Sequence, residues 1–204
     1  MAKIEYDGHI FDSEDEKKFY IWLVEAKAYG LIEHFTVHPE EIELIPKKQY
    51  AKRVLNKRTK TVGMKKGHLL ASLSYQPDFE FTINARMINI YADYFMYLGS
   101  SCKNLLVNGN IENIDSSIYH IKIIVDIKSA FGNKSGMNSS AVTFPIKQKI
   151  LFELQGIFVN KIIVSKWFEN TWCPLKLKYM KNRKVPTLTK LGTGSRSIQE
   201  VLYE

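Results

Sequence analysis

The sequence predicts an α/β fold in which a mixed central β-sheet is flanked by helices. Two segments have apolar residues at helical spacing, residues 13–29 and residues 143–158. Apolar segments typical of strands precede the second helix, at 69–83 and 119–128, and another follows it at 160–168. Strands before and after helices in this way indicate an α/β fold with a mixed sheet.

The first predicted helix has recognisable ends. Ser13 is followed three residues later by Glu16, the pattern of a capping box at a helix start. Gly30 suits the end of the helix, because glycine adopts the left-handed conformation at little cost. The apolar residues between them are Phe19, Trp22, Leu23 and Ala26.

Two prolines limit the other elements. Pro145 is expected in the first turn of the second helix, where its missing N–H is tolerated. Pro77 is expected at a strand start or on a sheet edge. Residues 31–46 are predicted to be extended, and residues 130–141, rich in Gly, Ser and Asn, are predicted to form a loop.

We expect a single domain, residues 1–204, because 204 residues suit one core. Three segments differ from that core in composition. Residues 47–68 are expected to form an exposed mobile loop or the tip of a long hairpin. Residues 84–118 form an insertion without a clear pattern, and the basic tail 174–204 ends in a short predicted helix.

Composition excludes several classes of protein. No run of 18 apolar residues occurs, so we expect no membrane partner. The N-terminal residues lack the apolar segment of a secretory signal, and only two cysteines occur, so we expect a cytoplasmic protein. The histidines lack metal-ligand spacing and are expected on the surface or in turns: His9, His34, His38, His68 and His120.

Positive charge is concentrated in two blocks of a chain whose net charge is +8. Residues 47–68 contain nine Lys and Arg residues and no acid, and residues 176–184 contain five and no acid. Such blocks favour a nucleic-acid partner, although they also suit a solvated surface that maintains solubility. The residues expected to contact nucleic acid here are Lys52, Arg53, Lys57, Arg58, Lys60, Lys65, Lys66, Lys178, Lys181 and Arg183.

Acidic residues interrupt two of the predicted strands. Asp78 follows Pro77, and Asp126 lies two residues before Lys128 at the end of an apolar strand, so Asp126 and Lys128 share a face. Burying a charge is costly unless it is paired or bound to a metal. Two carboxylates from neighbouring strands suit Mg²⁺ or Mn²⁺, and the carbonyl of Ile127 offers a further oxygen.

Such a cation would polarise a phosphate and activate a water molecule. Lys128 would then orient the water or stabilise charge in the transition state. Structural alternatives stay open: Asp78 can cap a turn after Pro77, and Asp126 can form a plain salt bridge with Lys128.

The Pro-Asp pair at 77–78, followed by Asp-Ile-Lys at 126–128, resembles the motif of the PD-(D/E)XK nuclease superfamily. The resemblance covers roughly residues 6–165 apart from the insertion, and extends to small phage endonucleases that include Holliday-junction resolvases. It implies a restriction-endonuclease-like core. The four segments that carry it are FDSEDEKKFYIWLVEAKAYGLIEHF, YQPDFEF, VDIK and FPIKQKILFE.

The resemblance also implies residue roles. Asp78 and Asp126 match the metal ligands, and Lys128 matches the catalytic lysine. Glu16 matches the acid on the first helix that completes the metal site. In many relatives a short hairpin joins the two motifs, whereas here Asp126 follows Asp78 by 48 positions. The insertion contains other acids, so the pairing of Asp78 with Asp126 stays open: these are Asp93, Glu112 and Asp115.

Two residues on the predicted helices have both structural and functional explanations. Glu16 is the capping partner of Ser13, and periodicity puts Glu16 and Asp15 on opposite flanks of the apolar stripe, so only the resemblance prefers Glu16. Lys147 lies on an apolar stripe, from which it either snorkels to solvent or reaches the site or a phosphate. That stripe contains Ile150, Leu151, Leu154 and Phe158.

Together with the acidic and basic residues, the resemblance implies a phage-encoded, Mg²⁺-dependent deoxyribonuclease in the host cytoplasm. We expect it to hydrolyse phosphodiester bonds in branched DNA, as a Holliday-junction resolvase does in DNA recombination or processing. Cutting two strands symmetrically requires a homodimer. The alternatives are a non-catalytic nucleic-acid-binding protein on the same fold, and a nuclease that acts on DNA ends or transposon ends.

Overall fold

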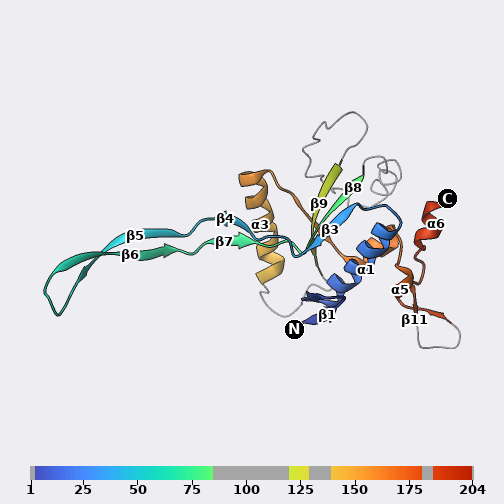
Figure 1. Cartoon of the computed structure of the whole chain (residues 1–204), viewed down its shortest axis with the longest axis horizontal. Coiled ribbons are helices and arrows are strands. Elements are labelled where there is room, and N and C mark those ends of the chain that lie inside the picture. The colour runs from blue at the N-terminus through green and yellow to red at the C-terminus, as the bar shows by residue number, and fades with distance from the viewer. Residues whose placement is uncertain (1–2, 85–119, 129–138, 181–185, 204) are drawn as a thin grey trace.

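The structure is a computed structural model that describes residues 3–84, 120–128, 139–180 and 186–203. It has a mixed α/β fold, in which small two-stranded sheets surround one four-stranded sheet (Figure 1). No helix in these described ranges is long and apolar enough to cross a membrane. The helices there are α1 (Glu14–Ala28), α3 (Ser139–Gln155), α4 (Val164–Asn170), α5 (Leu175–Lys178) and α6 (Ile198–Leu202).

The four-stranded central sheet has the order β10-β9-β8-β3. β3 pairs antiparallel with β8 and β8 antiparallel with β9, whereas β9 pairs parallel with β10. The parallel pair requires a crossover, which contains α3. The predicted mixed sheet is therefore confirmed. Its strands are β3 (His34–Val37), β8 (Phe79–Asn84), β9 (His120–Ile127) and β10 (Val159–Ile162).

Helices cover both faces of the central sheet, with α1 and α3 on opposite sides in Figure 1. On one face, Phe19 and Trp22 of α1 pack with Phe79 and Phe81 of β8 in the larger apolar cluster. On the other face, α3 contributes to a smaller cluster that contains Phe144, Leu151, Ile124 and Val159. Because side chains alternate along a strand, β8 and β9 contribute to both faces.

Helix α1 has the predicted ends. The side chain of Ser13 accepts a hydrogen bond from the N–H of Glu16, which satisfies one free donor of the first turn. At the other end, Gly30 adopts a φ of 71°, and Leu31 donates to the carbonyl of Ala26. Both the capping serine and the terminal glycine are thus confirmed.

Two predicted boundaries were wrong. Helix α3 begins at Ser139, so Pro145 lies inside the helix instead of in its first turn. The predicted strand 160–168 stops at Ile162, and α4 follows. The residues there favour strands by composition, but Val164, Trp167 and Phe168 are all buried, and their spacing puts them on one face of a helix.

The basic segment forms a long two-stranded hairpin, which extends away from the central sheet in Figure 1. Its strands are β5 (Lys48–Leu55) and β6 (Val62–Leu70), and we call residues 48–70 the arm. At its base, β4 (Ile42–Ile45) pairs with β7 (Leu73–Tyr75). The predicted hairpin is confirmed, because the paired strands exclude the alternative of an unpaired loop.

The remaining elements lie near the chain ends. The predicted short helix of the tail is α6, and the predicted insertion falls almost wholly outside the described residues. The two other two-stranded sheets pair β1 (Ile4–Tyr6) with β2 (His9–Phe11), and β11 (Tyr179–Met180) with β12 (Thr187–Leu188).

Candidate active site

The antiparallel pairing of β8 with β9 brings the two predicted aspartates together. Phe79 lies opposite Val125, and the N–H of Asp78 donates to the carbonyl of Val125 at 3.1 Å. At the far end of the same pair, Asn84 lies opposite His120. The 48 positions between the aspartates are therefore spanned by two paired strands and a connection at the end remote from the acids.

Asp126 is the buried centre of this group, with a relative exposure of 3%. Its Oδ1 accepts a hydrogen bond from the hydroxyl of Tyr75 at 2.9 Å. Its Oδ2 forms an ion pair with the ammonium of Lys128, as the shared strand face predicted. That oxygen is buried and makes no hydrogen bond of good geometry to any described residue, so a positive charge is its natural partner.

Asp78 lies where the β8–β9 pairing ends. Its Oδ2 accepts a hydrogen bond from the N–H of Ile127 at 2.5 Å, in place of a backbone carbonyl. The N–H and C=O of one strand residue point to the same side, so the carbonyl of Ile127 is also directed toward β8 and Asp78. The side chain of Ile127 packs in the larger apolar cluster.

The environment raises the pKa of Asp78 to about 8. Burial is the largest cause, followed by the negative charge of Asp126, and Glu16 acts in the same direction. The N–H of Ile127 and the charge of Lys128 oppose the shift. Two carboxylates so placed are strained when both are ionised, and a divalent cation between them would remove that strain.

Glu16 faces inward, and the predicted capping box is formed only in part, because Glu16 accepts from Asp12 and from the Ser13 hydroxyl instead of from the backbone N–H of Ser13. Its Oε1 accepts from the hydroxyl of Ser13 at 2.8 Å, and its Oε2 accepts from the N–H of Asp12 at 2.9 Å. Asp15 instead forms a surface ion pair with Lys18. The structure thus selects Glu16 over Asp15 as the inward acid, and its charge contributes to the pKa of Asp78.

The donor set fits a divalent cation in chemistry but is not closed around one. Among the described residues, no three histidine, cysteine or acidic side chains converge closely enough to hold a metal ion. The carboxylate oxygens of Glu16 and Asp78 already accept hydrogen bonds from backbone N–H groups and a serine hydroxyl. Those of Asp126 already contact Tyr75 and Lys128. A cation would have to replace some of these partners.

Two residues of the site were missed from the sequence. Tyr75 precedes the Pro-Asp pair closely, yet only the β4–β7 pairing shows that it reaches Asp126. His38 follows β3 with a φ of 46°, rare for a residue with a side chain. Its N–H donates to the carbonyl of Asp78, and its Nε2 lies 3.7 Å from Glu16 Oε2.

The two lysines near the acids differ in their contacts. Lys128 lies half-buried with its Nζ 5.3 Å from the ring centroid of Phe144. Lys147, which was expected to snorkel or to reach the site or a phosphate, donates to the carbonyl of Ser74 at 2.8 Å. Ser74 precedes Tyr75, so Lys147 binds the residue next to the tyrosine whose hydroxyl contacts Asp126.

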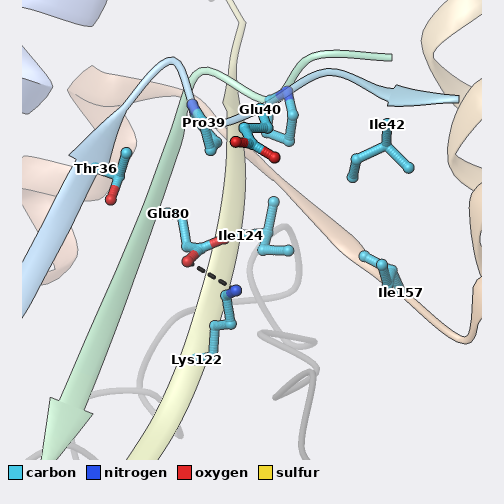
Figure 2. A pocket seen from close by; sticks show the side chains of 9 residues that line it. Thr36, Pro39, Glu40, Ile42, Glu80, Lys122, Ile124 and Ile157 are labelled. Atoms are coloured by element: carbon cyan, nitrogen blue, oxygen red, sulfur yellow. Dashed lines mark ion pairs between the residues drawn. The ribbon is translucent and has the colours of Figure 1, made fainter. Parts of the chain in front are cut away.

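A cleft of about 370 Å³ adjoins the acids through Pro77, next to Asp78. Glu80 and Lys122 form a 2.8 Å ion pair within it, as Figure 2 shows. Ile124 lines it too, and alternation puts Ile124 on the same face of β9 as Asp126. The other lining residues are Thr36, Pro39, Glu40, Ile42 and Ile157.

The expected nucleic-acid contacts fall into three groups. Lys178 is buried and pairs with Glu200 at 3.3 Å, so it is not a surface cation and we withdraw it from the set. Lys181 and Arg183 lie outside the described residues. Seven others are exposed on the arm: Lys52, Arg53, Lys57, Arg58, Lys60, Lys65 and Lys66.

Comparisons of the chain with protein-family models, with curated proteins and with solved structures found no match.

Proposed function

We propose that this protein is a metal-dependent DNA endonuclease that hydrolyses phosphodiester bonds on a restriction-endonuclease-like core. The observation that carries the proposal is the contact of buried Asp126 with half-buried Lys128 beside Asp78. Two carboxylates and a lysine at the end of paired strands are costly to bury without a function, since apolar residues would stabilise the same position better.

The carboxylates of Asp78, Asp126 and Glu16 and the carbonyl of Ile127 would hold Mg²⁺ or Mn²⁺. When bound, the cation supplies Lewis-acid polarisation of the phosphate and an acidified water. Tyr75 holds Oδ1 of Asp126 and so aims Oδ2 toward the site. Lys128, next to that oxygen, would orient the attacking water and stabilise the charge of the phosphate.

We further propose that the substrate is branched DNA such as a Holliday junction, cut by a homodimer during phage recombination or DNA processing. The exposed basic arm supports a DNA partner. DNA ends and transposon ends are alternative substrates for the same chemistry.

A second candidate is a non-catalytic DNA-binding protein. The absence, within the described residues, of three converging metal ligands favours it. So does the internal hydrogen bonding of Glu16 and Asp78.

Cleavage of synthetic junctions, flaps and linear duplexes with Mg²⁺ or Mn²⁺ separates the two candidates. We expect the wild-type chain to cut at least one of these substrates and Asp126→Ala to cut none. Glu80→Gln is the matched control, since Glu80 is an acid on the same sheet that pairs with Lys122, away from Lys128. Equal products from wild type and Asp126→Ala would refute the proposed catalysis.

A further inference from the structure

The arm and its flanking residues carry the whole excess of positive charge. Nine of the 29 Lys and Arg residues, and none of the 21 Asp and Glu residues, lie within residues 47–68. The other 182 residues therefore hold 20 basic and 21 acidic residues, a net charge of −1. The basic character of the chain is thus a property of one hairpin.

The arm contains nothing that compensates this charge. Lys52 lies directly opposite Lys65, and like charges in such cross-strand positions destabilise a hairpin. Arg53 faces Met64, and Leu55 faces Val62, so opposite charges do not meet across the ribbon. A two-stranded hairpin alone is only marginally stable in water. An anionic partner would therefore stabilise the arm as well as bind it.

The tip of the arm is well formed. The carbonyl of Asn56 accepts from the N–H of Lys60, and its N–H donates to the carbonyl of Thr61. Its side chain accepts from the N–H of Arg58 at 3.1 Å. The cations of the turn, Lys57, Arg58 and Lys60, are all exposed. Apolar side chains are exposed beside them, with Val62 at 66% and Met64 at 63%.

We infer that the arm is a ribbon that lies in a groove of duplex DNA. A two-stranded ribbon fits the major groove, which is about 12 Å wide. The cations would contact phosphates, and Val62 and Met64 would contact base edges and sugars. The choice of DNA as the polyanion rests on the proposed nuclease function.

The arm also defines the length of duplex required. β5 has eight residues, which at about 3.4 Å per residue gives roughly 27 Å, the length of about eight base pairs. β7 continues from the arm and ends at Tyr75, which binds Asp126. A duplex engaged by both the arm and the acids therefore needs to extend about one helical turn beyond the scissile bond.

A second copy of the chain is a poorer occupant. Outside its own basic segment that copy has a net charge of only −1, which cannot neutralise nine positive charges. Duplex DNA carries one negative charge per roughly 1.7 Å of its axis and can.

The test measures binding in EDTA, by fluorescence anisotropy, with duplexes of 30 and 6 base pairs. The tip variant replaces Lys57, Arg58 and Lys60 with Gln. We expect it to bind the 30-base-pair duplex roughly tenfold or more weakly, with a salt slope shallower by about 2.7 for three lost contacts. The 6-base-pair duplex is shorter than the arm, so wild type should bind it more weakly than the 30-base-pair duplex, and the tip variant should lose less affinity for it because fewer contacts are at stake. The matched control replaces three exposed lysines outside the arm with Gln: Lys149, Lys166 and Lys190.

A second variant, Val62→Ser with Met64→Ser, tests insertion into the groove. It should lower affinity severalfold without altering the salt slope, because no charge changes. Unchanged affinity in this variant would refute groove contact. Equal losses of DNA affinity in the tip and control variants would overturn the inference. So would wild-type binding of duplex RNA as tight as that of duplex DNA. A tip variant with a changed sedimentation coefficient but unchanged DNA affinity would also overturn it. Absence of cleavage would not affect these measurements, so the two proposals fail separately.

Discussion

One face of the central sheet is covered by α1 and buries a continuous aromatic cluster, whereas the face covered by α3 buries a smaller apolar cluster together with Asp126. On the first face, Trp22 stacks on Trp172 with 4.6 Å between ring centroids. Trp22 also packs edge-on against Trp167, with 5.2 Å between ring centroids. On the second, Tyr75 divides its contacts between the ring of Phe144 and the carboxylate of Asp126.

Because side chains alternate along β8 and β9, one face of these strands contributes to the apolar core and the other face carries the candidate site. Phe79 and Val125 face the aromatic cluster, and their neighbours Asp78 and Asp126 face the site. The free energy lost by burying carboxylates on one face is offset by apolar burial on the other. Variants on the two faces should consequently act on different properties.

The largest effect is expected from Trp22→Ala on the aromatic face. Trp22 is 1% exposed, and truncating such a side chain leaves a cavity that costs about 3–5 kcal/mol of unfolding free energy. Chemical denaturation measures it. Phe152→Ala, on an α3 residue that is 48% exposed, should cost less than about 1 kcal/mol. Similar losses in the two variants would contradict the difference between core and surface.

Asp78→Asn should have the opposite sign on stability. The raised pKa means that folded Asp78 holds its proton more tightly than the unfolded chain does, so wild-type stability falls as pH rises from about 4 to 8 and then levels. Asparagine still accepts from Ile127 but has no charge. We expect it to gain on the order of 2 kcal/mol at pH 8 and almost nothing at pH 4, measured without divalent ions. A gain independent of pH would contradict the account.

Tyr75→Phe should destabilise the site face by about 1–2 kcal/mol, because it removes the hydroxyl that donates to buried Asp126. The phenyl ring keeps the packing against Phe144. In the double variant with Asp126→Asn the additional loss should shrink, since the hydrogen bond to an ionised partner is already absent. Additive losses would show that the hydroxyl acts elsewhere.

Mg²⁺ binding should release a proton below pH 8. A ligand carboxylate must be ionised, so the apparent affinity should rise up to about tenfold per pH unit and level above pH 8. Calorimetry in buffers of different ionisation enthalpy counts the proton. Asp78→Asn should abolish the release, and pH-independent binding to wild type would exclude Asp78 as a ligand.

Asp126 and Lys128 could be paired from the sequence because strand alternation relates them locally, whereas Asp78 was joined to them only through the resemblance of its Pro-Asp motif. Tyr75 and His38 could not, since their proximity depends on pairing between distant strands and on a left-handed backbone at His38. Local composition also misassigned residues 160–168. The β-branched residues of this segment favour a strand, but a helix from Val164 onward buries Trp167 in the core.

The connection between β8 and β9 leaves at Asn84 and returns at His120, whereas the acids lie at the other end of the pair. Its length is therefore decoupled from the geometry of the site. Closing a connection of about 35 residues instead of eight costs only about 1 kcal/mol more by chain statistics. Such a junction is a place where foreign segments can be exchanged, and where a reporter domain can be inserted, while Asp78 and Asp126 keep their register.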